Sequence, residues 1–137
     1  MTSTVVYEKD LRVTCTHLQS SSQVETDAPV DNQGKGERFS PTDLLATSLA
    51  TCMLTIMGIK ARSLGLAIDG TRIDVEKIMY ADPRRVGQIN LTVQLPENLL
   101  GVNQKEQQVL KNAALTCPVI KSIHPDIKVD IHWGAWA

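Results

Sequence analysis

Apolar and polar residues alternate in several short runs along the chain, and a period of two predicts β-strands. Near the N-terminus, three short runs are predicted to be strands: Val5–Tyr7, Leu11–His17 and Gln23–Thr26. Short polar turns separate them, so we expect a small antiparallel meander. The following segment, Val30–Arg38, is polar and contains glycine, which predicts a loop.

The next pattern is a long apolar run that predicts a helix from Ser40 to about Leu64. Ser40 is a favourable N-cap, Pro41 suits the first helical position, and Asp43 completes a Ser-x-x-Asp capping pattern. Gly65 stands just after the last apolar position, where a glycine commonly ends a helix.

Apolar residues surround most of this helix, so a single sheet cannot cover all of its faces. We therefore expect a second copy of the chain to cover the rest and the protein to be a homodimer. The run from Leu44 to Ile59 is too short to span a bilayer comfortably, so we expect no membrane partner. The apolar positions are Leu44, Leu45, Leu49, Met53, Leu54, Ile56, Met57 and Ile59.

The second half of the chain returns to a period of two. The runs Thr71–Tyr80 and Val86–Leu95 predict a hairpin, and a change of phase near Glu76–Lys77 indicates a bulge there. Asn103 is the expected N-cap of a second helix, and Asp126–Trp133 is the expected last strand. The order of elements predicts an α+β fold with antiparallel pairing.

Length and charge limit the possible functions. A chain of 137 residues is expected to form a single domain over residues 1–137 with its own core. The formal net charge of -1 gives no electrostatic reason to expect nucleic acid as a partner. No basic segment followed by an apolar one opens the chain, so we expect a cytoplasmic location, where cysteines stay reduced.

Two of the three cysteines lie where a thiol can become reactive. Cys52 shares a face of the long helix with Ser48, a polar neighbour. Cys117 precedes Pro118, which should break one helix and begin another. Cys117 would then be an N-cap, where free N–H groups lower the pKa of a thiol. A buried cysteine often only fills space, and Cys15 on its strand is interpreted in this way.

The other polar residues suggest no second kind of chemistry. No metal-binding or phosphate-binding motif occurs, so we expect no metal site. A Cys–His nucleophile pair stays open as a weaker alternative, although no histidine pairs with a carboxylate at helical spacing. The histidines are His17, His124 and His132, and the residues interpreted as solvated loop charges are Asp27, Asp31 and Glu37.

The segment from Arg38 to Cys52, together with Cys117-Pro118-Val119, resembles the OsmC/Ohr family. Its Ser-Pro-Thr-Asp-Leu-Leu start and Cys52 fit the family pattern (N/S)-P-x-(E/D)-L-(L/F)-x(6)-C. The resemblance implies an intertwined homodimer with antiparallel sheets wrapped around long, buried central helices. It also implies a thiol-dependent peroxidase for organic hydroperoxides, with no bound cofactor and an external dithiol reductant of the lipoyl or another type.

The resemblance also implies roles for single residues. Cys52 corresponds to the peroxidatic thiol and Cys117 to the resolving thiol, which would form a Cys52–Cys117 disulfide. Arg38 is the best match for the arginine that holds the thiolate and orients the peroxide. Three further residues are expected to contribute to binding: Glu37, Asp43 and Ser48.

The chain departs from the peroxidase members at Thr42, where they have a glutamate that partners the arginine. Asp43 lies one residue later and is turned by about 100° around the helix, so we expect it to cap the helix. Glu37 could take the place of the glutamate. The alternative function is an OsmC-like protein that binds a small ligand or acts in stress, with little or no peroxidase turnover.

Overall fold

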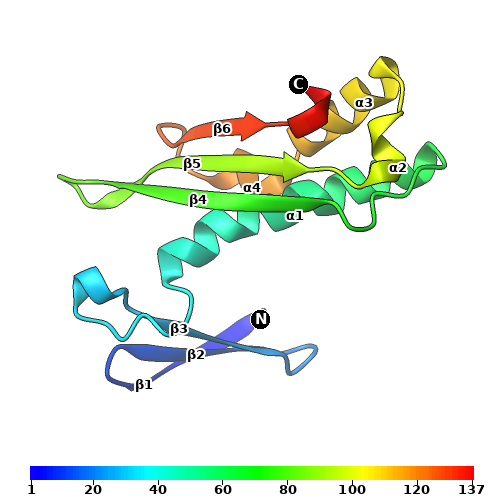
Figure 1. Ribbon diagram of the computed structural model, residues 1–137. Helices are drawn as coiled ribbons and strands as arrows, with labels where there is room; N and C mark the ends of the chain where they lie inside the picture. The colour runs from blue at the N-terminus through cyan, green and yellow to red at the C-terminus, as the bar shows by residue number, and fades with distance from the viewer. The chain divides into compact units, whose positions relative to one another are not determined.

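The computed structural model describes all residues, 1–137, and forms two compact units, Met1–Leu45 and Ala46–Ala137. The single domain expected over residues 1–137 stays a prediction. Figure 1 shows the elements, which are β1 (Ser3–Lys9), β2 (Arg12–His17), β3 (Gln23–Asp27), η1 (Val30–Asn32), α1 (Pro41–Ser63), β4 (Arg72–Tyr80), β5 (Arg85–Gln94), α2 (Glu97–Leu100), α3 (Gln104–Ala114), α4 (Pro118–Ser122), β6 (Lys128–His132) and η2 (Gly134–Trp136).

The first unit contains a three-stranded sheet in the order β1-β2-β3, antiparallel throughout as predicted. Asp10 and Leu11 join β1 to β2 and have φ values of 53° and 63°. Two consecutive residues with positive φ are the geometry of a type I′ hairpin turn. In the loop after β3, a Cβ at Gly34 would lie 1.7 Å from the Ala28 carbonyl oxygen, so only glycine fits there.

Helix α1 has the predicted limits because both of its ends carry the expected signals. The Asp43 N–H donates to Ser40 Oγ at 3.0 Å, and the Ser40 N–H donates to Asp43 Oδ2 at 2.9 Å. At the other end, Gly65 has a φ of 68°, and the Leu66 N–H donates to the Ala61 carbonyl at 2.9 Å. This is a Schellman-type helix end.

The core of the second unit lies between α1 and the β4-β5-β6 sheet (Figure 1). Leu49, Met53 and Met57 recur every four residues along α1, and all three are fully buried. They belong to one cluster with Ile89 and Leu91 of β5. The spacing places these side chains on one face of the helix, which fixes the face that α1 turns toward the sheet.

The opposite face of α1 is not covered to the same degree. Ile59 is 61% exposed, and Thr55 on the same face is also exposed. By length and composition alone α1 could cross a membrane, but the core helices of soluble proteins often have the same length and composition.

Strand β6 pairs in parallel with β5, so the prediction of antiparallel pairing throughout is wrong for this pair. The connection between the two strands carries α2, α3 and α4. Such a helical crossover carries the chain back to the end of the sheet where β5 began, which makes the next strand parallel. Ile89 pairs with Val129 and Leu91 with Ile131, and all four contribute to the core.

The β4–β5 hairpin has its irregularity closer to the turn than predicted. Ile78 pairs with Gln88 but Met79 pairs with Val86, which leaves Gly87 as the extra residue on β5. A Cβ at Gly87 would lie 2.1 Å from the ring of Tyr80. The bulge near Glu76–Lys77 was therefore placed wrongly, because the glycine on the partner strand determines its position.

Candidate functional site

Cys117 is the N-cap of α4, as the Cys-Pro sequence predicts. The Ile120 N–H donates to Cys117 Sγ at 3.3 Å, and Pro118 occupies the start of the helix. The side chain of Cys117 is fully buried, with an exposed fraction of 0%. The thiol therefore caps a short helix from inside the core.

The pKa of Cys117 is raised above its ordinary value, which corrects the prediction of a lowered one. Burial is the largest cause, since it disfavours the charged thiolate. The interaction of the Cys117 S–H with Cys52, as donor, and the negative charge of a Cys52 thiolate act in the same direction, whereas the N–H groups of Ile120 and Val119 lower the pKa. Capping alone does not outweigh the loss of solvent around this sulfur.

Cys52 and Cys117 are neighbours in the structure. Cys52 lies in the middle of α1 and packs against the core cluster that contains Cys117. The pKa of Cys117 responds to Cys52, which agrees with two nearby side chains, and both cysteines are free thiols. Cys52 is partly exposed whereas Cys117 is sealed from solvent. Neighbouring thiols can condense to a disulfide once one of them is oxidised.

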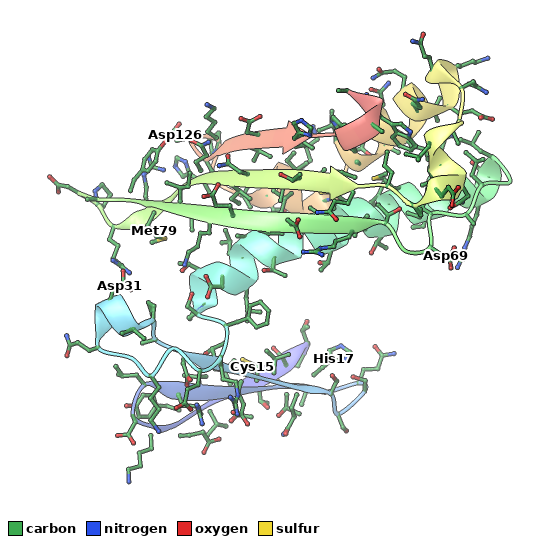
Figure 2. The ribbon with its side chains drawn as sticks, in the orientation of Figure 1. Cys15, His17, Asp31, Asp69, Met79 and Asp126 are labelled. Atoms are coloured by element: carbon green, nitrogen blue, oxygen red, sulfur yellow. The ribbon has the colours of Figure 1, made fainter.

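Ser48 and Cys15 lie in surroundings that differ from those of the two thiols Cys52 and Cys117. Ser48 lies one helical turn before Cys52 on α1 and is partly buried. Cys15 lies on β2 of the first unit, opposite Val5 and Val24 in the neighbouring strands (Figure 2). Its position in the sheet agrees with the interpretation of Cys15 as a structural residue.

Arg38 lies in the loop before α1, where two acceptors of the first unit hold its side chain. Arg38 Nε donates to Glu25 Oε2 at 3.2 Å, and Nη1 donates to the Glu37 carbonyl at 3.0 Å. The side chain is 47% exposed. A guanidinium has five N–H donors, so these two bonds orient the group and leave it able to bind an anionic ligand.

Three of the predicted site residues meet in one place within the first unit. Glu37, Arg38 and Asp43 line a shallow pocket of about 380 Å³ together with Gly36 and Phe39. Asp43 accepts the Ser40 N–H at the start of α1, which confirms the prediction that it caps the helix. The pocket thus combines one guanidinium, two carboxylates and one aromatic ring.

Asp27 is buried, which corrects its interpretation as a solvated loop charge. Only 1% of it is exposed, and Arg12 donates from Nε to Oδ1 and from Nη2 to Oδ2, both at 2.8 Å. The guanidinium holds the pKa of Asp27 below its usual range, and the carboxylate raises the pKa of Arg12 further. Arg12 Nη2 also donates to Glu37 Oε2 at 3.0 Å, so Glu37 is tied to this ion pair.

The sequence analysis missed Glu25 and Asp27 as partners of the two arginines. The antiparallel register places Arg12 opposite Asp27 and Thr14 opposite Glu25. Opposite charges on facing positions of two strands attract, so this register contained the signal for the Arg12–Asp27 pair. The contact of Arg38 with Glu25 depends on the path of a loop, which no periodicity predicts.

A family model described as OsmC-like protein matches residues 34–132, which include Arg38, Cys52 and Cys117. The chain belongs to the OsmC-like family. The resemblance and the α+β class predicted from the sequence are thereby confirmed.

Solved structures support the same assignment. A Psychrobacter arcticus protein, named for an assumed role in osmotic stress and detoxification, is 55% identical with a TM-score of 0.92, over 97% of this chain and 95% of that chain. A Legionella pneumophila protein named as an organic hydroperoxide resistance protein OsmC is 18% identical with a TM-score of 0.72, over 97% and 96% of the two chains. OhrB of Bacillus subtilis is 19% identical with a TM-score of 0.66, over 97% and 98%.

At 18% and 19% identity, the last two structures show a likeness of fold. No curated protein sequence matches the chain.

Proposed function

We propose that this OsmC-like protein is a thiol-dependent peroxidase that reduces organic hydroperoxides. The observation that carries the proposal is the packing of a partly exposed thiol, Cys52, against the core cluster that contains a buried thiol, Cys117. The names of the Legionella pneumophila and Bacillus subtilis proteins, which refer to hydroperoxide resistance, favour the same chemistry.

The reaction needs three balanced steps. The Cys52 thiolate attacks one peroxide oxygen, the O–O bond breaks, and the alkoxide leaves and takes up a proton to give the alcohol. Cys52 is then a sulfenic acid, which Cys117 Sγ attacks to form a Cys52–Cys117 disulfide and release water. An external dithiol, of the lipoyl or another type, reduces this disulfide and is itself oxidised. No bound cofactor takes part.

The different surroundings of the thiols suit these different roles. Cys52 is the thiol that a peroxide can approach, because Cys117 is sealed. Burial raises the pKa of Cys117, which favours its protonated form while Cys52 reacts.

Arg38 is proposed to hold the Cys52 thiolate and to orient the peroxide, since a guanidinium favours a neighbouring anion. Its orientation by Glu25 supports this role. In peroxidase members a glutamate at the position of Thr42 partners the arginine, and Glu25 would partner Arg38 here. Glu37 and Asp43 would shape the pocket beside Arg38, and Ser48 would be the polar neighbour of Cys52.

The protein is further proposed to act as a cytoplasmic homodimer. The exposed apolar face of α1, where Ile59 is 61% exposed, supports a second copy of the chain as the partner. The substrates would then be a small organic hydroperoxide and a thiol reductant.

A single oxidation experiment tests the function. Reduced protein receives one equivalent of cumene hydroperoxide, and mass spectrometry of peptides follows the thiols. We expect a Cys52–Cys117 disulfide, which is absent in Cys52→Ser. In Cys117→Ser the Cys52 sulfenic acid should accumulate, and dimedone should trap it. Cys15→Ser is the matched control and should form the disulfide as the wild type does.

Turnover is measured as peroxide consumption with dihydrolipoamide, compared with a monothiol at the same thiol concentration. If Cys52 and Cys117 stay reduced in excess peroxide, the peroxidase proposal is wrong. Thr42 at the position of the glutamate favours the second candidate in that case, an OsmC-like protein that binds a small ligand without efficient turnover.

A further inference from the structure

Asp27 holds the residues on both sides of Arg38. Its Oδ2 accepts the Glu37 N–H at 3.1 Å, and its own N–H donates to the Phe39 carbonyl at 3.1 Å. One residue at the end of β3 therefore fixes the backbone immediately before and immediately after Arg38. Because Asp27 is only 1% exposed, solvent does not compete for these bonds.

Ala28, the residue after Asp27, holds the same loop through its carbonyl group. The Ala28 carbonyl accepts the Gly36 N–H at 3.2 Å, and the absence of a Cβ at Gly34 lets the loop pass close to that carbonyl. The loop thus returns along Asp27 and Ala28 over residues 36–39. A flexible arginine side chain can be aimed only if the backbone that carries it is fixed.

Arg12 explains why an aspartate can lie at this position. A buried carboxylate is costly unless it is paired and hydrogen-bonded. The two N–H groups of Arg12 occupy both carboxylate oxygens at 2.8 Å, and one of them also reaches Glu37 Oε2 at 3.0 Å. The ion pair connects β2, β3 and the loop in one network.

We propose that Asp27 is a positioning residue, which holds the Glu37–Phe39 segment through hydrogen bonds so that Arg38 is presented at the pocket. Asp27 does not touch the substrate and acts only through Arg38. The functional part of this inference rests on the peroxidase function proposed above, whereas the attachment of the segment does not depend on it.

The test uses the full chain with Asp27→Asn, which keeps the shape of the side chain and removes its charge. Amide hydrogen exchange should become faster at Glu37 and in the loop around Arg38. The second-order rate of Cys52 oxidation by cumene hydroperoxide should fall at least about tenfold, because small displacements of a catalytic group are costly. Arg38→Met should lower the rate similarly, and the double variant should be no slower than Arg38→Met alone.

Asp10→Asn is the matched control, because it removes an exposed ion pair with Lys35 in the same unit, and asparagine tolerates the positive φ of 53°. Its exchange pattern and rate should equal those of the wild type. If Asp27→Asn does not fold, Arg12→Lys replaces it, since lysine keeps the charge but loses the two-pronged contact.

Two outcomes overturn the inference. In the first, exchange at Glu37 does not change. In the second, exchange at Glu37 becomes faster but the rate of Cys52 oxidation stays within about twofold of the wild type, although Arg38→Met is slow. The second outcome also includes a double variant in which the rate losses of Asp27→Asn and Arg38→Met multiply, because Asp27 would then not act through Arg38. A wild type that does not react with peroxide overturns the proposed function instead, and exchange at Glu37 then decides the role of Asp27 by itself.

Discussion

Cys52 and Cys117 are the same type of residue, yet their surroundings give them different properties. Cys117 is enclosed by the core, so its pKa is raised mainly by burial, even though it caps a helix. Cys52 lies at the edge of the same core and keeps some contact with solvent. A division of labour between an attacking and a resolving thiol therefore needs no other residue to impose it.

This coupling predicts how Cys117 titrates when Cys52 is replaced. In Cys52→Ala, the hydrogen bond and the negative charge of Cys52 are lost, and both of them raise the pKa of Cys117. The pKa of Cys117 should therefore fall, although burial should keep it above its ordinary value. The ¹³Cβ chemical shift of Cys117, followed by NMR over a pH series, measures the midpoint in both proteins.

Cys15→Ala is the control for this titration, since Cys15 lies in the sheet of the first unit. Its effect on the midpoint of Cys117 should be negligible. An unchanged or higher midpoint in Cys52→Ala would show that the two thiols are not coupled as described.

Among the secondary-structure elements, α1 depends on its first turn, and this gives a prediction of stability. In Ser40→Ala the hydroxyl that accepts the Asp43 N–H at 3.0 Å is lost from a site that is only 2% exposed. The free energy of unfolding should fall by about 1 kcal/mol, which is typical for loss of an N-cap. Urea denaturation at a fixed protein concentration measures the change.

Ser63→Ala serves as the comparison, because the Ser63 hydroxyl is exposed and bonds only to the Lys60 carbonyl one turn earlier in the same helix. This variant should lie within about 0.5 kcal/mol of the wild type. Equal effects of the two substitutions would mean that the cap does not stabilise α1.

The elements that the sequence predicted correctly are those whose signals are local. Ser40, Asn103 and Cys117 each cap a helix through an N–H three residues ahead, so a short stretch of sequence contains the whole interaction. The burial of Asp27 and the parallel direction of β6 depend on contacts between distant segments. No single stretch contains their signals: the Arg12–Asp27 pair follows from the register of two strands, and the direction of β6 follows from the crossover that carries α2, α3 and α4.

In the whole molecule, the residues named in the proposed reaction belong to different units. The unit Met1–Leu45 carries Arg38 with its pocket, and the unit Ala46–Ala137 carries both thiols. The network around Asp27 explains how the first part keeps its shape, and the packing around α1 explains how the second part keeps its own. The proposed chemistry needs both parts, so the tests above vary them separately and in combination.

The exposed apolar face of α1 gives the last prediction, which concerns assembly. Beside Ile59 the surface has a hollow of about 540 Å³, lined also by Leu54, Ile68 and Asp69. Asp69 lies in the turn after α1 (Figure 2). Exposed apolar surfaces of this kind commonly mark interfaces. We expect light scattering of the wild type to give twice the chain mass of 15.0 kDa.

Ile59→Asp places a charge on this face, and burying an unpaired charge in an interface is strongly unfavourable. The measured mass should therefore shift toward 15.0 kDa as the protein is diluted. Leu100→Asp is the control, because Leu100 of α2 is similarly exposed, at 52%, but lies outside the hollow. A wild type that is monomeric at every concentration would refute the dimer, whereas an Ile59→Asp protein that stays dimeric would show that another surface forms the interface.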